Sequence, residues 1–412
     1  MATVVLVGTL DTKGVEYEYV KKCIQEAGCA VILVDAGILG EPPIRPDISA
    51  GDVIKLLNKD MADIRFSEEG SDTRSVAIET MSEGLKVCLK KLINEGKCDA
   101  VFGMGGSGGT NLISSAMRSL PLGVPKLLLS TMMSGDVKPY IHGKDITMMY
   151  SVTDIAGLNR FSRLILANAA HAIAGMALNY KKALDHSAGV KKPLIAMTMF
   201  GVTTPGVLHI RDLLEDKGFE TIVFHATGAG GMAMESMIRE KLIDGVIDYT
   251  TTEICDYELG GVFSAGEDRL TAAGEMGIPQ VVVPGALECL NFNGIDHLPN
   301  EFKTPERKLI IHNSTVCAVK ASKNELIRLG EVFTQKVNAA KGLTEIALPL
   351  DGLDKYEEGP WKDQETDQAL FDSIMRHSNV PVNKIKGTIN TPSFAKAVAD
   401  IFLRLWNQEH NK

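Results

Sequence analysis

Residues 99–120, DAVFGMGGSGGTNLISSAMRSL, join an apolar run to a segment of helical periodicity through a glycine-rich loop. Five of the seven positions 103–109 are glycine. Because glycine loses more backbone entropy on folding than any other residue, a plain strand-to-helix turn does not account for five of them. The stretch therefore predicts a strand, a loop and a helix, with a loop backbone that another group approaches closely.

The same order of elements extends along the whole chain. Continuous apolar runs of strand length alternate with segments of helical periodicity, which predicts parallel βαβ units. Runs such as VILV (31–34) lack alternation, so we expect a sheet covered on both faces. In the first half, the expected strands are residues 3–8, 30–37, 98–106, 124–131 and 146–154, and the expected helices are 15–28, 75–96 and 157–185.

The second half of the chain repeats the first in outline. Residues 4–37 align with residues 194–228 as strand, polar turn, helix, glycine, strand and glycine turn. The predicted fold is α/β, with two Rossmann-like lobes, mostly parallel sheets and an interlobe cleft. We expect an N-terminal Rossmann-like nucleotide-binding lobe over 1–190 and a C-terminal α/β lobe over 191–412. The helix at 157–185 is a crossover or a dimer-packing element, and its length leaves both open.

Composition excludes several classes of partner. The 412 residues carry 43 basic and 52 acidic side chains, a net charge of −9, without a basic stripe for nucleic acid. The N-terminus is predicted to be a strand and not an export signal, and we expect no apolar segment near the roughly 20 residues that cross a bilayer. Seven scattered cysteines without a CxxC pair indicate reduced thiols in a cytoplasmic protein.

Polar and glycine-rich clusters follow the predicted strands of the first lobe. They are residues 8–14 (GTLDTKG), 35–37 (DAG), 103–110 (GMGGSGGT) and 130–131 (ST). Because ligands of open parallel sheets bind at the carboxyl ends of the strands, these loops predict one shared pocket.

The glycine loop is predicted to bind an anion. Backbone N–H groups at a helix N-terminus attract negative charge, glycines let phosphate oxygens approach, and Ser107 and Thr110 add hydroxyls. The loop fits neither the GxGxxG nor the GxxxxGK[ST] pattern, so it indicates phosphate without naming the ligand. The alternative is close packing of the loop against a neighbouring helix or strand.

Other residues of the first lobe surround this loop. Lys13 is placed to meet a phosphate, and Asp11 or Thr12 to cap the helix or to bind a ribose or a metal-bound water. The alternative is an ordinary cap beside a solvated lysine. Asp35 stands where dinucleotide folds hold a ribose-binding carboxylate. Arg74 either reaches an anion in the pocket or is a solvated loop arginine.

The second lobe offers a further glycine nest and groups for proton chemistry. Gly228, Gly230 and Gly231 form a second candidate nest, for an anion or a carboxylate, and Thr203 and Thr204 are expected to line the cleft. A zinc site has little support because HExxH spacing is absent, and no catalytic residue is assigned. The acid, base and thiol candidates are His225, Glu253, Cys255, Asp256, Glu258, Glu288, Cys289, Asp296, His297 and His312.

Residues 4–20 (VVLVGTLDTKGVEYEYV), 34–37 (VDAG) and 101–110 (VFGMGGSGGT) resemble an uncharacterised protein family of bacteria and fungi that includes the N-terminal ATP-binding domain of the tomato mosaic virus resistance protein. The resemblance covers essentially the whole chain. It implies a two-lobed homodimer that binds ATP in the N-terminal lobe, with Mg²⁺ left open. Carried over by motif, the implied nucleotide site is Thr9, Asp11, Thr12, Lys13, Asp35, Arg74, Gly105, Gly106, Ser107, Gly108, Gly109 and Thr110.

Two functions of different class follow from this resemblance. Some relatives continue into a barrel-like domain, so the first is a regulatory or scaffold protein that binds ATP and acts on a separately encoded barrel-domain partner. The alternative is an enzyme that acts on ATP or a phosphorylated small molecule with acid and base residues of the C-terminal lobe. The missing P-loop and the lack of a clear Mg²⁺ carboxylate pair favour binding over rapid hydrolysis.

Overall fold

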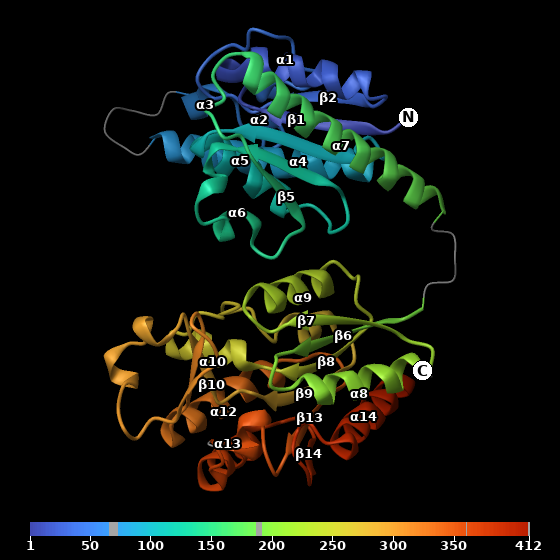
Figure 1. Cartoon of the computed structure of the whole chain (residues 1–412). Coiled ribbons are helices and arrows are strands. Elements are labelled where there is room, and N and C mark those ends of the chain that lie inside the picture. Colours follow the sequence, from blue (N-terminus) through green and yellow to red (C-terminus); the bar gives the residue numbers. More distant parts are fainter. Residues whose placement is uncertain (66–72, 187–191, 360, 411–412) are drawn as a thin grey trace. The chain divides into compact units, whose positions relative to one another are not determined.

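The computed structural model describes residues 1–65, 73–186, 192–359 and 361–410. The chain divides into two compact units, Met1–Val190 (unit 1) and Lys191–Lys412 (unit 2), shown in Figure 1. Both units contain a parallel sheet with helices packed against it, which confirms the predicted α/β class with mostly parallel sheets.

Unit 1 is built on a five-stranded parallel sheet with the order β2-β1-β3-β4-β5. Its strands are β1 (Thr3–Gly8), β2 (Ala30–Asp35), β3 (Ala100–Gly105), β4 (Lys126–Ser130) and β5 (Ile146–Tyr150). Its helices are α1 (Leu10–Glu26), α2 (Ala50–Lys55), α3 (Ala62–Arg65), α4 (Thr73–Asn94), α5 (Ser107–Arg118), the 3-10 turn η1 (Thr131–Ser134), α6 (Lys138–Ile141) and α7 (Arg160–His186).

Helices cover both faces of this sheet, as the continuous apolar strands predict. On one face, α1 and α7 bury Tyr17 and Ile173 against the sheet. On the other, α2, α4 and α5 bury Val53, Leu85 and Ile113. The two helices that follow the central strands β1 and β3 therefore lie on opposite faces, which leaves a crevice between their N-termini at the carboxyl edge of the sheet.

The expectation that no apolar segment reaches membrane-spanning length is wrong for α7. Within the described residues, Arg160–Leu184 is long and apolar enough to cross a bilayer by length and composition. Its many alanines raise the mean hydropathy without large apolar side chains. In the structure, one side of α7, including Leu166, Ala170 and Ala177, is buried in the core of unit 1. α7 thus packs as a core helix beside α1.

Unit 2 is built on a six-stranded parallel sheet with the order β14-β13-β9-β8-β6-β7. Its strands are β6 (Leu194–Met199), β7 (Glu220–His225), β8 (Gly245–Thr250), β9 (Gln280–Gly285), β13 (Thr344–Pro349) and β14 (Val382–Ile385). The helices are α8 (Thr204–Glu215), α9 (Ala229–Arg239), α10 (Thr252–Leu259), α11 (Ala272–Met276), α12 (Lys323–Asn338), α13 (Gln364–His377) and α14 (Pro392–His410), with 3-10 turns η2 (Ile295–His297), η3 (Asn300–Phe302) and η4 (Lys355–Glu358).

The two sheets share their strand order. Read across the sheet, the order β7-β6-β8-β9-β13 of unit 2 matches the order β2-β1-β3-β4-β5 of unit 1. The internal repeat is therefore visible in the topology. Unit 2 adds β14 at one edge and a small antiparallel sheet of β10 (Cys289–Phe292), β12 (Cys317–Lys320) and β11 (Leu309–Ile311). The sequence does not predict β14, α13 or the antiparallel sheet.

Candidate functional site

A cavity of about 300 Å³ lies at the carboxyl edge of the unit 1 sheet, between the ends of β1 and β3. The strand order changes direction at this pair, and such switch points are where open α/β sheets bind ligands. Eight of the predicted site residues line the cavity: Thr9, Asp11, Thr12, Lys13, Gly106, Ser107, Gly108 and Gly109. Six further residues line it: Ala36, from the predicted loop 35–37, and Ile38, Leu39, Ile78, Leu112 and Asp154, which were not predicted.

The N-terminus of α5 forms one wall of the cavity. Gly106 is the N-cap residue, and no side chain of the described chain caps this end of the helix. The first intrahelical bond runs from the N–H of Thr110 to the carbonyl of Gly106, at 2.8 Å. The N–H groups of residues 107–109 precede this bond and point out of the helix, where the dipole adds positive potential. This wall suits an anion.

Three glycines of the loop have no structural need to be glycine. A Cβ on Gly106, Gly108 or Gly109 would come no closer than 3.9 Å to any described atom outside the adjoining residues and the backbone of the same helix. None of the three has a positive φ angle. Packing and backbone conformation would therefore tolerate alanine at each position, yet all three line the cavity. What the missing side chains keep clear is the cavity itself.

The other two glycines of the loop are explained by packing. A Cβ on Gly103 would lie 2.6 Å from Cγ2 of Ile113, and one on Gly105 would lie 3.1 Å from the Cα of Gly109. The packing alternative thus holds for Gly103 and Gly105, which belong to β3. It does not hold for the three glycines that follow the strand.

Lys13 brings a cation to the opposite wall. The predicted polar turn is in fact a helical turn, and Lys13 interrupts α1 with φ −131° and ψ 21°. Its Nζ donates a hydrogen bond to the carbonyl oxygen of Ile155 at 2.5 Å. Thr9 and Thr12 place their hydroxyl oxygens 3.2 Å apart beside it. The wall therefore offers one ammonium group and two hydroxyls.

Two carboxylates accompany this cation. Asp11 accepts the N–H of Leu39 through Oδ2 at 2.8 Å, while its Oδ1 is buried against Gly37 without a hydrogen-bond partner among the described residues. Asp154 accepts the N–H of Ile155 through Oδ1 at 2.8 Å. Sequence reasoning missed Asp154. Its position after β5 was the available signal, because the residues after β1 and β3 also reach the cavity.

Of the other four predicted residues, three do not line the cavity and the fourth, Arg74, is not tested. Asp35 is buried and accepts the N–H groups of Leu10 at 3.1 Å and Gly37 at 2.9 Å, so it fixes the start of α1. The Thr110 hydroxyl is buried 2.5 Å from that of Ser130. Gly105 is packed as described above. Arg74 lies in the first turn of α4, and its side chain is outside the part of the chain that the structure describes.

The glycine nest of unit 2 is occupied by a carboxylate of the protein itself. Oε1 of Glu253 accepts the N–H groups of Gly228 at 2.6 Å and Gly231 at 3.0 Å, at the N-terminus of α9. A Cβ on Gly230 or Gly231 would collide with His225 or Glu253. These glycines are therefore required for packing, and the predicted anion or carboxylate nest holds a carboxylate of the protein itself, that of Glu253.

A buried arginine balances that carboxylate. Arg269 has no exposed surface and donates to Glu253 at 2.6 Å, to both oxygens of Asp248 and to Glu235 at 3.5 Å. Burial alone would lower the pKa of Arg269, but the three carboxylates hold it well above its usual value. Burial also raises the pKa of Glu253 and Glu235 against the opposing effect of Arg269. This cluster is a closed ion network.

The thiol and acid candidates of unit 2 are mostly inaccessible. Burial raises the pKa of Cys255 and Cys289 well above that of a free thiol, which disfavours the reactive thiolate. Burial also raises the pKa of Asp256 to about 7, although Asn291 and the N–H of Phe263 donate to its carboxylate. Glu258 is paired with Arg328 at 2.9 Å.

The remaining unit 2 candidates are not gathered into one site by any contact we observe. His225 is exposed at the end of β7, with its ring 5.8 Å from that of Phe200. Thr203 bonds Thr250 at 2.8 Å in the interior. Thr204 donates a hydrogen bond to the carbonyl of Phe200, and Glu288 is buried. The last three candidates are exposed and lie near the antiparallel sheet: Asp296, His297 and His312.

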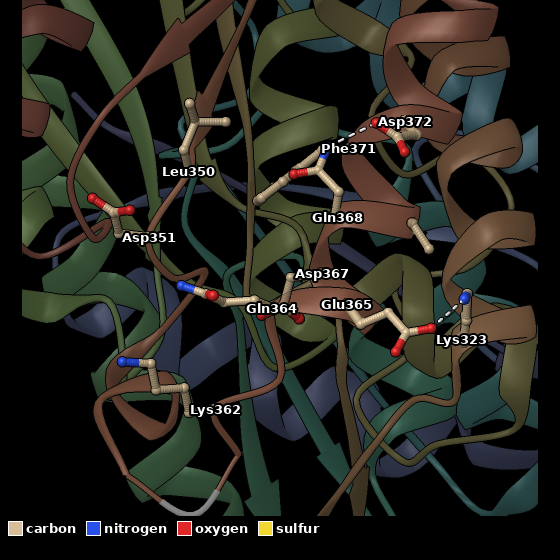
Figure 2. A pocket seen from close by; sticks show the side chains of 11 residues that line it. Lys323, Leu350, Asp351, Lys362, Gln364, Glu365, Asp367, Gln368, Phe371 and Asp372 are labelled. Atoms are coloured by element: carbon tan, nitrogen blue, oxygen red, sulfur yellow. Dashed lines mark hydrogen bonds and ion pairs between the residues drawn. The ribbon is translucent and has the colours of Figure 1, made fainter.

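A second cavity, of about 600 Å³, lies in unit 2 beside the first turns of α13 (Figure 2). Two pairs of its lining residues contact each other. Lys323 contacts Glu365 at 2.6 Å, and Gln368 donates to Asp372 at 2.7 Å. Asp363 caps the N-terminus of α13 by accepting the N–H of Thr366. None of the unit 2 candidates from the sequence lines this cavity, and the buried Asp367 in its wall forms an ion pair with Lys320 at 2.8 Å.

Comparison with family models matches both halves of the chain. Residues 2–182 match the N-terminal domain of the family described as Uncharacterised protein family (UPF0261), and residues 192–406 match its C-terminal domain.

Similar proteins occur in bacteria and in tomato. A UPF0261 protein of Clostridium tetani is 43% identical over 401 residues, which are 96% of this chain and 97% of that protein. A UPF0261 protein of Mesorhizobium japonicum is 40% identical over 97% of this chain and 98% of its own length. The ToMV resistance protein Tm-1 of Solanum lycopersicum is 38% identical over 81% of this chain and 45% of its own length.

Solved structures resemble the fold only distantly. MurG of Acinetobacter baumannii aligns with 98% of this chain and 99% of its own at 13% identity, with a TM-score of 0.22. A UDP-GlcNAc 2-epimerase of Methanocaldococcus jannaschii, in complex with UDP-GlcNAc and UDP, aligns with 68% of this chain and 83% of its own at 8% identity, with a TM-score of 0.21. Likeness at this level carries no argument about a ligand.

Proposed function

The chain belongs to the uncharacterised protein family UPF0261, and we propose that its unit 1 binds an adenine nucleotide, with ATP as the ligand. The phosphates lie against the N-terminus of α5 and Lys13. The observation that carries the proposal is the uncapped, glycine-rich start of α5, which lines the same cavity as Lys13 at the β1/β3 switch point. Helix N–H groups and a lysine ammonium are complementary to phosphate oxygens.

The contrast between the two units strengthens this proposal. In unit 2, a helix N-terminus beside glycines is filled by the Glu253 carboxylate, which Arg269 neutralises. In unit 1, no described carboxylate accepts the N–H groups at the start of α5. A ligand anion would accept these N–H groups, as the Glu253 carboxylate accepts those of Gly228 and Gly231 in unit 2.

The rest of the cavity is suited to the remainder of a nucleotide. Ile38, Leu39, Ile78 and Leu112 give it an apolar side on which a base can rest. Asp11 and Asp154 offer carboxylate oxygens, which accept ribose hydroxyls and are ligands that Mg²⁺ takes together with phosphates. Within the described residues, no cluster of three or more histidine, cysteine, aspartate or glutamate side chains forms a metal site. Adenine as the base rests on the family resemblance.

We favour a binding protein with a regulatory or scaffold role, in the cytoplasm, over an enzyme. The observation that favours it is that Glu253, Asp256 and Cys255 of unit 2 are buried, and that the two carboxylates accept hydrogen bonds within the protein. An enzyme that acts on ATP or a phosphorylated small molecule remains the second candidate. The homodimer and the separately encoded barrel-domain partner stay predictions from the resemblance.

Isothermal titration of the full chain with ATP, ADP, NAD and inorganic phosphate tests the binding, and a phosphate-release assay separates the two functions. We expect ATP to bind more tightly than NAD or phosphate and to be released without turnover above the protein-free rate. Steady turnover that Lys13→Ala abolishes would favour the enzyme. Absence of binding by all four compounds would refute the proposal.

A further inference from the structure

The loop between β5 and α7, residues 151–159, connects the cavity to the last helix of unit 1; we call it the β5–α7 loop. It lines the cavity with Asp154 and is held to α1 at two points. Lys13 donates to the carbonyl of Ile155 at 2.5 Å, and the buried Glu16 accepts the N–H of Gly157. The lysine that faces the cavity is thus also a tether of this loop.

The tethered loop contains a strained residue. The N–H of Thr153 donates to the carbonyl of Ser151 at 2.7 Å, which closes a three-residue turn around Val152. Val152 has a φ angle of 65°, and positive φ is unfavourable for a β-branched residue. Val152 is 53% exposed, so burial contributes little to holding it there. Such strain persists only where surrounding contacts impose it.

The loop leads directly into α7. Asn159 caps this helix, since its Oδ1 accepts the N–H groups of Phe161 and Ser162, each at 2.9 Å. α7 then packs beside α1 along the core of unit 1. A change in the β5–α7 loop is therefore passed to the first turn of α7.

We propose that the β5–α7 loop is a ligand-responsive switch in which an anion in the cavity draws Lys13 away from the Ile155 carbonyl and lets Val152 relax to negative φ. This inference rests on the proposed function, because the anion is the nucleotide phosphate. A doubly charged phosphate attracts the ammonium group more strongly than a neutral carbonyl does. Losing the Lys13 tether removes one of the two contacts that hold the β5–α7 loop to α1. The strained turn is then held by the hydrogen bonds of Ser151 to Ser130 and Thr153.

Relief of strain in the free protein tests the switch. Glycine adopts positive φ without cost, so Val152→Gly stabilises the tethered form and opposes its release. We expect this variant to bind ATP about tenfold more weakly than the wild type in isothermal titration. Lys241→Gly is the matched control, because Lys241 also has a positive φ of 59° but lies in unit 2. That variant is expected to bind ATP with wild-type affinity.

Hydrogen exchange gives an independent readout in the wild-type chain. With saturating ATP, the amide of Thr153 is expected to exchange severalfold faster, because its hydrogen bond to Ser151 closes the strained turn that relaxes. If Lys13 instead bridges phosphate and carbonyl, Val152→Gly will bind ATP like the wild type and loop exchange will not change. That result overturns the switch and leaves the proposed function intact. A wild type that binds neither ATP nor phosphate refutes both.

Discussion

The carboxylate of Glu253 lies 2.6 Å from the backbone nitrogen of Gly228 and closes the N-terminus of α9 from within the protein. The N-terminus of α5 in unit 1 has no such carboxylate among the described residues, and it lines a cavity. Two units with the same strand order thus treat a glycine-bordered helix terminus in opposite ways. This difference underlies our assignment of the ligand site to unit 1.

Replacing Lys13 by methionine is predicted to weaken ATP binding about 10- to 100-fold, because a hydrogen bond to a charged group contributes about 1.5–3 kcal/mol. Isothermal titration measures the effect. Lys22→Met is the control, since Lys22 lies on the same helix but pairs with Glu18 at the surface. Equal affinities of the two variants would exclude Lys13 from the site.

Replacing Gly108 by alanine is predicted to lower ATP affinity while leaving the fold intact or more stable. The new Cβ has room within the protein, and alanine is favoured over glycine in a helix by about 0.5–1 kcal/mol. Chemical denaturation reports stability and titration reports binding. Gly103→Ala should behave oppositely in denaturation, because its Cβ would lie 2.6 Å from Ile113. A destabilised Gly108→Ala would show that packing explains this glycine after all.

Replacing Arg269 by methionine is predicted to destabilise unit 2 by about 3–5 kcal/mol, because three buried carboxylates lose their counter-ion. Urea denaturation measures the loss. Arg239→Met provides the comparison, since its pair with Glu275 is partly exposed and should contribute about 1 kcal/mol or less. Similar losses in both variants would contradict a tightly coupled network.

Asp256 is predicted to make stability fall as pH rises. Its pKa is about 7 in the folded chain and about 4 in the unfolded chain, so between these values the folded state binds the extra proton. The unfolding free energy then decreases with pH, by at most about 1.4 kcal/mol per unit. We expect wild type to lose stability relative to Asp256→Asn from pH 4.5 to 7.5, measured by denaturation. A constant difference over this range would show that Asp256 does not titrate there.

Much of the fold is predictable from local patterns. The strands of unit 1 and the repeat between the halves follow from continuous apolar runs and regular spacing, and the carboxyl-edge loops follow from the parallel order. Polar, irregular segments were harder to predict. Val382–Ile385 (VNKI) has too few apolar residues for a strand, and it becomes β14 by pairing with β13 at the sheet edge.

The candidate site was predicted in its loops but not in every residue. The residues after β1 and β3 converge because parallel strands end at one edge. Asp35 was misplaced because its carboxylate turns to the N–H groups of Leu10 and Gly37, a choice made by local hydrogen bonds that spacing does not reveal. Gly231 and Gly108 have similar surroundings in sequence. Only the structure shows that Glu253, from another helix, occupies the space beside Gly231.

The most direct test of the central claim is isothermal titration of ATP into the wild type, Gly108→Val and Gly175→Val. Both glycines are in helices of unit 1 and have open space around them, but only Gly108 lines the cavity. We predict that the wild type and Gly175→Val bind ATP with similar affinity and that Gly108→Val, while folded, does not. Equal binding by all three proteins, or binding by none, would contradict a nucleotide site at the start of α5.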